Sequence, residues 1–252
     1  MKNLTSIAEY YKTDKHEHGY TKIYEKYFES LRDKKLQILE IGIADGKSLL
    51  TWSDYFKNST IIGIDIHKIN LIEKNLDRTN IKVHQGSQSD ENFIKEITNN
   101  YGNFDIIIDD GSHKNKDVIN SFNHLFPYLK FGGLYVIEDL QTSYIPNWGG
   151  DGVNLNNKKT TMNFIRSLAD RMHYQDIDNP FYQKHDFDGL IEFVHIYRNI
   201  AFIKKQKRFY ESNLCYKNSW YLGLKKNRKD FNFKSLRDLR YFIKYFIKHI
   251  LG

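Results

Sequence analysis

The sequence predicts an α/β fold in which a mostly parallel sheet, with helices on both faces, ends in an antiparallel hairpin. Two observations support this prediction. Short apolar runs alternate with stretches of helical spacing between residues 37 and 138, as the crossover connections of a parallel sheet require. The last two strand-like runs, Leu190–Tyr197 and Ile200–Lys205, are separated by only two residues, which is too short a link for a crossover helix. This pair is therefore expected to be antiparallel.

The expected elements follow in order from the N-terminus. Residues 1–35 are rich in tyrosine and are expected to be helical. Gly46 permits a tight turn from the first strand into a helix over Lys47–Phe56. The parallel strands are expected at Gln37–Ile43, Thr60–Ile66, Ile81–His84, Phe104–Asp109 and, after a glycine turn, Gly133–Glu138. A mostly parallel sheet closed by a hairpin is the Rossmann-like arrangement of class I methyltransferases.

The sequence shows no internal repeat, low-complexity linker or second-domain boundary, so a single domain with three parts is predicted. Residues 1–35 are expected to form a helical cap that contributes to the mouth of the active site. Residues 36–206 are expected to form the cofactor-binding core, and residues 207–252 a basic C-terminal extension.

The composition is ordinary for a soluble globular protein, with 40% hydrophobic and 27% charged residues among 252. The single cysteine, Cys215, excludes an intramolecular disulfide and argues against a thiolate metal site. The N-terminus lacks the apolar stretch of a signal peptide, and no apolar run approaches the ~20 residues of a transmembrane helix, so a cytoplasmic location is expected. Most of the excess behind the net charge of +7 follows residue 203, where a solvated basic face is a better explanation than nucleic-acid binding.

A glycine-containing loop between Glu40 and Gly46 follows the first strand and precedes a helix, which is the position of a cofactor loop in such sheets. Gly42 and Gly46 permit close approach of a ligand to the backbone, and Ala44 is nearly as small. The loop does not fit the dinucleotide fingerprint, because Ala44 and Lys47 take the places of its second and third glycines. A sulfonium cofactor with an amino-acid tail and a ribose, S-adenosylmethionine, fits better, since acids hold its ammonium and hydroxyl groups. Glu40 is assigned to the cofactor together with the small residues of the loop.

Three side chains farther along the chain are also assigned to the cofactor. Asp65, at the end of the second strand, is placed to accept hydrogen bonds from ribose hydroxyls, although it is also a suitable helix N-cap. Gln88 follows the third strand and is expected to reach the adenine, although turn chemistry explains this residue almost as well. Asp109, which ends the fourth strand, completes the set.

Three carboxylates, Asp110, Glu138 and Asp139, occur where the fourth and fifth strands end. Ligands of open α/β sheets bind at that carboxyl edge. Carboxylates gathered there repel one another and have raised pKa values unless a cation joins them. Because oxygen ligands favour Mg²⁺, with Mn²⁺ or Ca²⁺ as substitutes, the sequence predicts a divalent-cation site. The alternatives are a simple turn after Asp109 and a helix cap at Glu138 and Asp139.

Transfer of a methyl group to an alcohol needs an oxygen of alkoxide character aimed at the sulfonium methyl group. Metal coordination at Asp110 acidifies a bound hydroxyl. His113 is then expected to take the proton as general base. Asp110 and His113 are therefore the predicted catalytic residues, and a surface histidine without a catalytic role is the alternative for His113.

Five motifs carry a resemblance that spans residues 13–205. They are Thr13-Asp14-Lys15, Glu40-Ile41-Gly42, Asp109-Asp110-Gly111-Ser112-His113, the run from Gly132 through Leu140, and Thr142-Ser143-Tyr144. The sequence resembles the metal-dependent sugar O-methyltransferases that modify macrolide and polyketide glycosides. This resemblance implies that Asp110, Glu138 and Asp139 bind Mg²⁺ and that His113 is the base. It also implies that the substrate is a hydroxyl of a sugar carried by a larger molecule.

The members of that family that act on antibiotics have a longer N-terminal region, so we expect neither their acceptor pocket nor their assembly in this chain. In size and composition the chain is more similar to bacterial enzymes that modify surface polysaccharides, including capsular heptoses. The predicted acceptor is therefore a nucleotide-linked or surface-polysaccharide sugar.

The segment Gln141–Asp151 follows the predicted metal ligands directly and is expected to meet the acceptor. Tyr144 or Trp148 is suited to stacking on a sugar face, and Lys15 and Tyr20 are expected at the same mouth. A packed surface loop and solvent-facing polar residues are the alternatives.

A predicted helix that starts near Ser235 carries apolar residues at helical spacing and basic residues on its other faces. Such a stripe packs on the domain or on a partner subunit, which favours a homodimer. Peripheral membrane contact through this helix is the alternative.

The leading interpretation is a Mg-assisted, S-adenosylmethionine-dependent sugar O-methyltransferase. A catechol-type small-molecule O-methyltransferase would use a similar metal site, and a nucleic-acid methyltransferase would bind RNA or DNA in a salt-dependent manner. A membrane-associated binding module that retains the fold without catalysis is the alternative from a different class.

Overall fold

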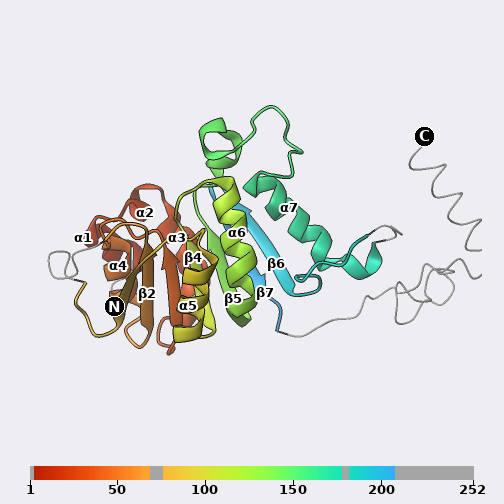
Figure 1. The fold of residues 1–252 in the computed structure, drawn as a ribbon. Coiled ribbons are helices and arrows are strands. Elements are labelled where there is room, and N and C mark those ends of the chain that lie inside the picture. Colours follow the sequence, from red (N-terminus) through yellow and green to blue (C-terminus); the bar gives the residue numbers. More distant parts are fainter. Residues whose placement is uncertain (1–2, 69–75, 178–181, 208–252) are drawn as a thin grey trace, which may run out of the picture. The chain divides into compact units, whose positions relative to one another are not determined.

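The computed structural model describes residues 3–68, 76–177 and 182–207. The strands are β1 (Gln37–Ile41), β2 (Thr60–Asp65), β3 (Ile81–Gln85), β4 (Phe104–Asp109), β5 (Leu129–Ile137), β6 (Ile191–Tyr197) and β7 (Ile200–Lys205). They form one seven-stranded sheet in the order β3-β2-β1-β4-β5-β7-β6 (Figure 1). Strands β1 to β5 are parallel, whereas β7 runs antiparallel to both β5 and β6. The predicted α/β fold with a terminal hairpin is therefore confirmed.

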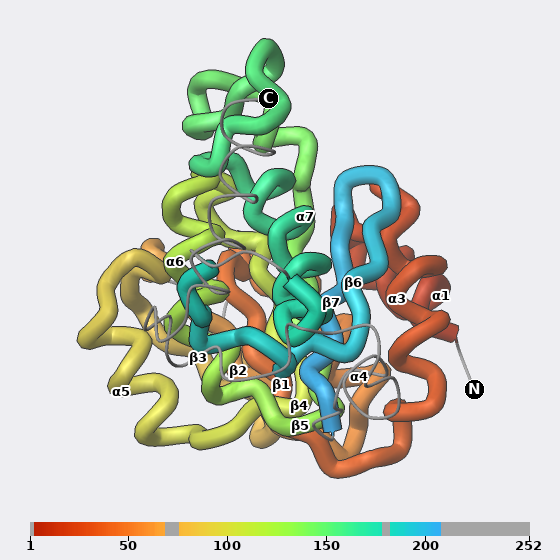
Figure 2. Tube along the Cα trace, turned by 90° about the vertical axis from the view of Figure 1, so that its right-hand side faces the viewer, coloured from red at the N-terminus to blue at the C-terminus, as the bar shows by residue number. Residues whose placement is uncertain are grey.

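Helices cover both faces of this sheet. The α-helices are α1 (Leu4–Tyr11), α2 (Asp14–Glu17), α3 (Tyr20–Phe28), α4 (Lys47–Tyr55), α5 (Glu91–Tyr101), α6 (Asn115–Leu125) and α7 (Thr161–Met172). Short 3₁₀ helices lie at η1 (Glu29–Leu31), η2 (Phe126–Tyr128), η3 (Leu140–Tyr144), η4 (Pro146–Trp148) and η5 (Tyr174–Asp176). Figure 2 shows α5 and α6 on one side of the sheet and α1 and α3 on the other.

The strand residues alternate between two hydrophobic cores, as the period of a β-strand requires. On β4, Ile107 packs in the core that α5, α6 and α7 cover, while Ile106 and Ile108 pack in the core that α1, α3 and α4 cover. All three side chains are fully buried. Burial on both faces explains why the central strands are apolar almost throughout.

Two strand boundaries differ from those predicted by more than one residue. Strand β1 ends at Ile41 rather than Ile43, because the backbone of Gly42 turns to φ +77°. Strand β5 begins at Leu129, which pairs with Phe104, rather than at residue 133. The glycines that were expected to form a turn instead lie within the strand, at a shift in its register with β4.

The chain divides into two compact units. The sheet and its helices belong to the unit formed by residues 1–172 and 185–209, and the second unit comprises residues 173–184 and 210–252. Of the second unit the structure describes residues 173–177, with η5, and 182–184. The predicted helix after Ser235, and with it the expected membrane or subunit contact, lies outside the described residues. Within the described ranges, no helix has the length and apolar character needed to span a membrane.

A buried lysine on β7, Lys205, links the hairpin to the chain segment that leads into β5. Its ammonium donates hydrogen bonds to the carbonyl oxygens of Phe126, Pro127 and Leu129, at 3.0, 2.9 and 2.7 Å. These carbonyls lie where η2 ends and β5 begins, and a helix end leaves such groups without an internal partner. The role of Lys205 is thus structural.

The loops after β1 and β4 are in direct backbone contact. The amide of Asp110 donates to the carbonyl of Ile41 at 2.9 Å, and that of Gly42 donates to Ile64 at 2.8 Å. A Cβ atom on Gly42 would lie 2.2 Å from the carbonyl oxygen of Asp110. The sequence assigned Gly42 to close approach of a cofactor. That assignment stays a prediction, and the structure adds that the backbone of Asp110 lies close to Gly42.

We expect Gly42→Ala to destabilise the protein through two additive effects. The positive φ costs about 1 to 2 kcal/mol, and overlap with backbone that has no room to move costs about 1 to 3 kcal/mol more. The matched control is Gly149→Ala, because Gly149 has φ +75° but no atom within 4 Å of a Cβ. Urea denaturation measures both losses. Equal losses in the two variants would show that the contact with Asp110 is unimportant.

Candidate active site

Three carboxylates meet on one face of the sheet at its carboxyl edge. Glu40 on β1 shares the face of Ile38, and Asp110 follows β4 on the face of Ile108. Glu138 follows β5 on the face of Val136. The two-residue period of three neighbouring strands therefore brings these side chains together under the N-terminal helices.

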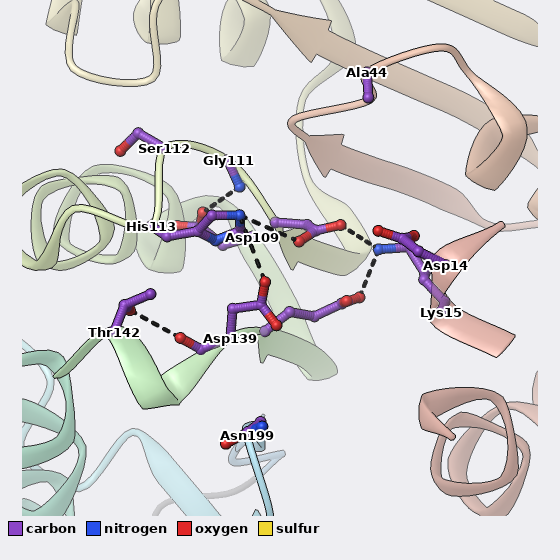
Figure 3. Close-up of polar contacts among 12 residues, drawn as sticks. Asp14, Lys15, Ala44, Asp109, Gly111, Ser112, His113, Asp139, Thr142 and Asn199 are labelled. Carbon is purple, nitrogen blue, oxygen red and sulfur yellow. Dashed lines mark hydrogen bonds and ion pairs between the residues drawn. The ribbon is translucent and has the colours of Figure 1, made fainter. Parts of the chain in front are cut away.

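Lys15 of α2 lies among these carboxylates, with 1% of its surface exposed. Figure 3 shows its ammonium joined by dashed lines to carboxylate oxygens. Its ammonium lies 2.5 Å from Asp110 Oδ2, 2.8 Å from Glu138 Oε1 and 3.4 Å from Glu40 Oε1. The sequence predicted Lys15 at the mouth of the site, as a substrate contact, with a solvent-facing side chain as the alternative. The burial of Lys15 excludes that alternative, because the attraction of three buried carboxylates holds the ammonium inside, and the predicted substrate contact stays a prediction.

Two tyrosines of α3 contact the carboxylates that follow β5. The hydroxyl of Tyr24 donates to Glu138 Oε1 at 2.5 Å, and that of Tyr20 donates to Asp139 Oδ1 at 2.8 Å. Burial, followed by these carboxylates, raises the pKa of both hydroxyls far above the usual tyrosine range. Both tyrosines therefore act as hydrogen-bond donors.

Asp110, His113 and Asp139 form a second cluster beside the first, with one ligand atom of each lying within 4.8 Å of the others. His113 Nε2 lies 3.6 Å from Asp139 Oδ2 and 3.9 Å from Asp110 Oδ1 (Figure 3). His113 and Asp139 both have left-handed backbones, with φ +56° and +53°. Such strain in non-glycine residues is typical of functional sites.

The donor set of this cluster suits a divalent cation. Carboxylate oxygens and an imidazole nitrogen are ligands for Mg²⁺ or Mn²⁺, and the gaps between them exceed hydrogen-bond lengths. Asp110 and Asp139 are two of the three predicted ligands. The structure directs the third, Glu138, to Lys15 and Tyr24 and brings His113 to the cluster in its place.

The electrostatics of this edge also favour an added cation. Burial raises the pKa of Asp110 and of Glu138, because charged forms are disfavoured away from water. Burial lowers the pKa of Lys15, but attraction by Asp110, Glu138 and Glu40 outweighs that effect and raises it overall. One ammonium thus faces several acids, and charge compensation is incomplete.

The predicted cofactor loop is held by Asp65. One of its oxygens, Oδ2, accepts from the amides of Ile43 and Ala44 at 3.0 and 3.1 Å, and Oδ1 accepts from His67 at 2.8 Å. Ala44 has φ +42°, which these hydrogen bonds stabilise. Gly46, at φ +80°, is the N-cap of α4. The assignment of these residues to a cofactor stays a prediction, and the structure adds that Asp65 shapes the loop.

The remaining predicted cofactor residues lie beneath the surface. Glu40 is fully buried and accepts from Ser48 Oγ at 2.8 Å. Burial raises the pKa of Asp109 to about 7. Gln88 links the loops after β3 and β4 because its amide donates to Asp109 at 3.3 Å and Ser121 at 2.8 Å, while its carbonyl accepts from the amide of Ser112 at 2.7 Å. The structure thus gives Gln88 a positioning role for the loop that carries Asp110 and His113.

A cavity of about 290 Å³ opens beside Asp139. Its lining consists of His18, Tyr20, Ile23, Asp139, Gln141, Arg198 and Asn199. Tyr20 was predicted to be at the mouth. Arg198 and Asn199 were not assigned to the site, although their turn between β6 and β7 was recognised in the sequence. The order of the strands could have revealed these two residues, because a hairpin that pairs with β5 brings its tip next to Asp139.

Tyr144 and Trp148, the predicted sugar-stacking residues, are 39% and 36% exposed and do not belong to the cavity lining. Asn115 fixes their segment, since its amide donates to the carbonyls of Thr142 and Trp148 at 3.1 and 2.8 Å. Its oxygen accepts from the amide of Thr161 at 2.6 Å. Asn115 thus anchors the segment, while its residues 144–149 are exposed, and stacking of Tyr144 or Trp148 on a sugar stays a prediction.

The chain is similar to known methyltransferases. Residues 39–140 match a family model described as a methyltransferase domain. The chain is 36% identical to the mycinamicin VI 2''-O-methyltransferase of Micromonospora griseorubida over 200 residues, covering 75% of this chain and 48% of the relative. It is also 36% identical to the 8-demethyl-8-(2-methoxy-alpha-L-rhamnosyl)-tetracenomycin-C 3'-O-methyltransferase of Streptomyces olivaceus, over 75% of this chain and 49% of that one.

A solved structure of the MycE methyltransferase, in complex with Mg, SAH and mycinamycin VI, is similar in three dimensions. Its TM-score is 0.75 at 34% identity, and the match covers 81% of this chain and 54% of that one. This chain spans about half the length of the curated relatives that it matches.

We expect Gln88→Met to lower the free energy of unfolding by about 2 to 4 kcal/mol, since it leaves several buried polar groups without a partner. The matched control is Gln85→Met, because Gln85 is exposed near the same loop. Chemical denaturation without cofactor measures both. Unchanged stability combined with weaker cofactor binding would instead support the predicted contact between Gln88 and the adenine.

Proposed function

We propose that the protein transfers a methyl group from S-adenosylmethionine to a sugar hydroxyl with the help of Mg²⁺, because residues 39–140 match a methyltransferase-domain model and the sheet has the class I methyltransferase arrangement. The observation that carries this proposal is the cluster of Asp110, His113 and Asp139 at the carboxyl edge of the sheet, beside a cavity of about 290 Å³. The complex of MycE with Mg and SAH supports both cofactors.

The residues of the cofactor loop have distinct parts in the proposed activity. Asp65 keeps the backbone of Ala44 in its left-handed conformation and so shapes the loop between β1 and α4. Gly42 permits that loop to lie against Asp110. The cofactor side and the metal side of the site are thus joined through backbone contacts, which restricts the relative positions of donor and acceptor.

The proposed metal ligands are Asp110 and Asp139, while Glu138, the third ligand predicted from the sequence, is held beside them by Lys15 and Tyr24. Mg²⁺ bound there would acidify the acceptor hydroxyl and compensate the charge of the carboxylates. His113 accepts the hydroxyl proton at Nε2, which lies between Asp110 Oδ1 and Asp139 Oδ2. The two carboxylates stabilise the resulting imidazolium. Tyr20 keeps Asp139 oriented through its hydroxyl.

The proposed acceptor is a sugar that is linked to a nucleotide or belongs to a surface polysaccharide, such as a capsular heptose. The cavity is large enough for a sugar residue, and its lining supplies the polar side chains of Gln141, Arg198 and Asn199. The tetracenomycin relative is named for methylation of a rhamnosyl group, which supports a sugar as the acceptor class.

Calorimetric titration of S-adenosylmethionine and Mg²⁺ tests the proposed cofactors. We expect the wild-type protein to bind both and Asp110→Ala to lose Mg²⁺ binding, because that variant removes a central carboxylate of the cluster. Glu192→Ala is the control, since Glu192 is a surface carboxylate that pairs with Lys204 on the hairpin. Failure of the wild type to bind S-adenosylmethionine would overturn the proposed function.

His113→Gln tests the proposed base. We expect the rate of methyl transfer to fall by about 10² to 10⁴, which is the usual contribution of a general base, while calorimetry still detects both cofactors. The assay measures release of S-adenosylhomocysteine with a nucleotide-linked heptose as acceptor. Full activity in His113→Gln would exclude His113 as the base, and no turnover of this acceptor by the wild type would exclude the proposed heptose.

A further inference from the structure

The N-terminal helices supply a buried positive charge to the carboxyl edge of the sheet. Lys15 lies on α2, and its ammonium contacts one carboxylate within β1 and two that follow β4 and β5. Because only 1% of its surface is exposed, water does not hydrate the ammonium of Lys15. Buried ions of this kind persist only when paired, so the ammonium and the carboxylates depend on one another.

Asp110 belongs to both clusters. Its Oδ2 is bound by Lys15 at 2.5 Å, and its Oδ1 faces His113 Nε2 at 3.9 Å. The ammonium thus fixes the rotation of this carboxylate and aims one oxygen at the space between His113 and Asp139. Glu138 is fixed in a similar way, because Lys15 and Tyr24 both donate to its Oε1.

We propose that Lys15 is a built-in counter-cation, which keeps Asp110 and Glu138 in place before a divalent cation arrives and limits how tightly that cation then binds. Lys15 is a positioning residue in this role, since it acts through the carboxylates. The inference rests on the metal site of the proposed function.

The limit on affinity follows from shared charge. A divalent cation at Asp110 and Asp139 would bind Asp110, whose negative charge already neutralises Lys15. The ammonium also repels the cation across a short, poorly screened distance. Replacing Lys15 by an uncharged side chain of similar length therefore removes a repulsion and leaves unpaired carboxylates that a divalent cation can neutralise.

The test compares the full-length wild type with Lys15→Met, Lys15→Arg and Lys205→Met. Mg²⁺ affinity is measured by calorimetry, and Tm is measured with a chelator and with saturating Mg²⁺. We expect Lys15→Met to bind Mg²⁺ roughly tenfold more tightly or better, as the loss of a close like charge in a low dielectric implies. Its Tm should fall in chelator and recover with Mg²⁺.

The two other variants separate charge from packing. Lys15→Arg keeps the charge and should bind Mg²⁺ as the wild type does. Lys205 is also buried, but its ammonium binds carbonyl oxygens rather than carboxylates. Lys205→Met should therefore lower Tm equally with and without Mg²⁺ and leave the affinity unchanged.

Equal or weaker Mg²⁺ binding by Lys15→Met, in a protein whose wild type binds Mg²⁺, would overturn this inference and leave the proposed function intact. If Lys15→Met does not fold in chelator, the double variant Lys15→Met/Glu138→Gln is compared with Glu138→Gln, because it removes one buried charge of each sign. The double variant should again bind more tightly. Absence of Mg²⁺ binding by the wild type would overturn the metal site itself.

Discussion

The accumulation of carboxylates at one edge of the sheet sets the demands that the surrounding structure meets. Glu40, Asp110 and Glu138 end up close together because their strands are neighbours and their side chains share one face, and Asp139 directly follows Glu138. Burying several carboxylates together costs free energy, because each loses its hydration and they repel one another. The N-terminal helices offset it with one ammonium and two tyrosine hydroxyls. These helices are thus part of the site and also part of its hydrophobic core.

Backbone contacts give the edge its rigidity. Gly42 permits the loop after β1 to touch the loop after β4, and Gln88 ties the latter to the loop after β3. Asn115 does the same for the segment that follows Asp139. The close contact of Gly42 and the hydrogen bonds of Gln88 and Asn115 are thus made to other parts of the protein. The strained backbones of His113 and Asp139 are held by this framework.

The sequence predicted the sheet well because buried strands have a strong apolar signal and short links exclude crossover helices. It misplaced the start of β5, since a glycine pair that favours a turn also permits an irregularity inside a strand. It identified the acids and His113 from their positions at strand ends. The inward direction of Lys15 was missed, because α2 has only four residues and no clear periodicity. The two-residue period of the strands places Glu40, Asp110 and Glu138 on the same face of the sheet. This shared face would have indicated a buried cation.

The walls of the cavity come from turns and from helix α3 rather than from strands. His18 precedes α3, Gln141 lies in η3, and Arg198 and Asn199 form the tip of the β6–β7 hairpin. Of the residues that line it, Asp139 alone also belongs to the cluster with Asp110 and His113. Evolution can therefore exchange the cavity lining while the charged edge stays the same. Substitutions or insertions in these surface turns would change the proposed acceptor site and leave the proposed metal cluster as it is.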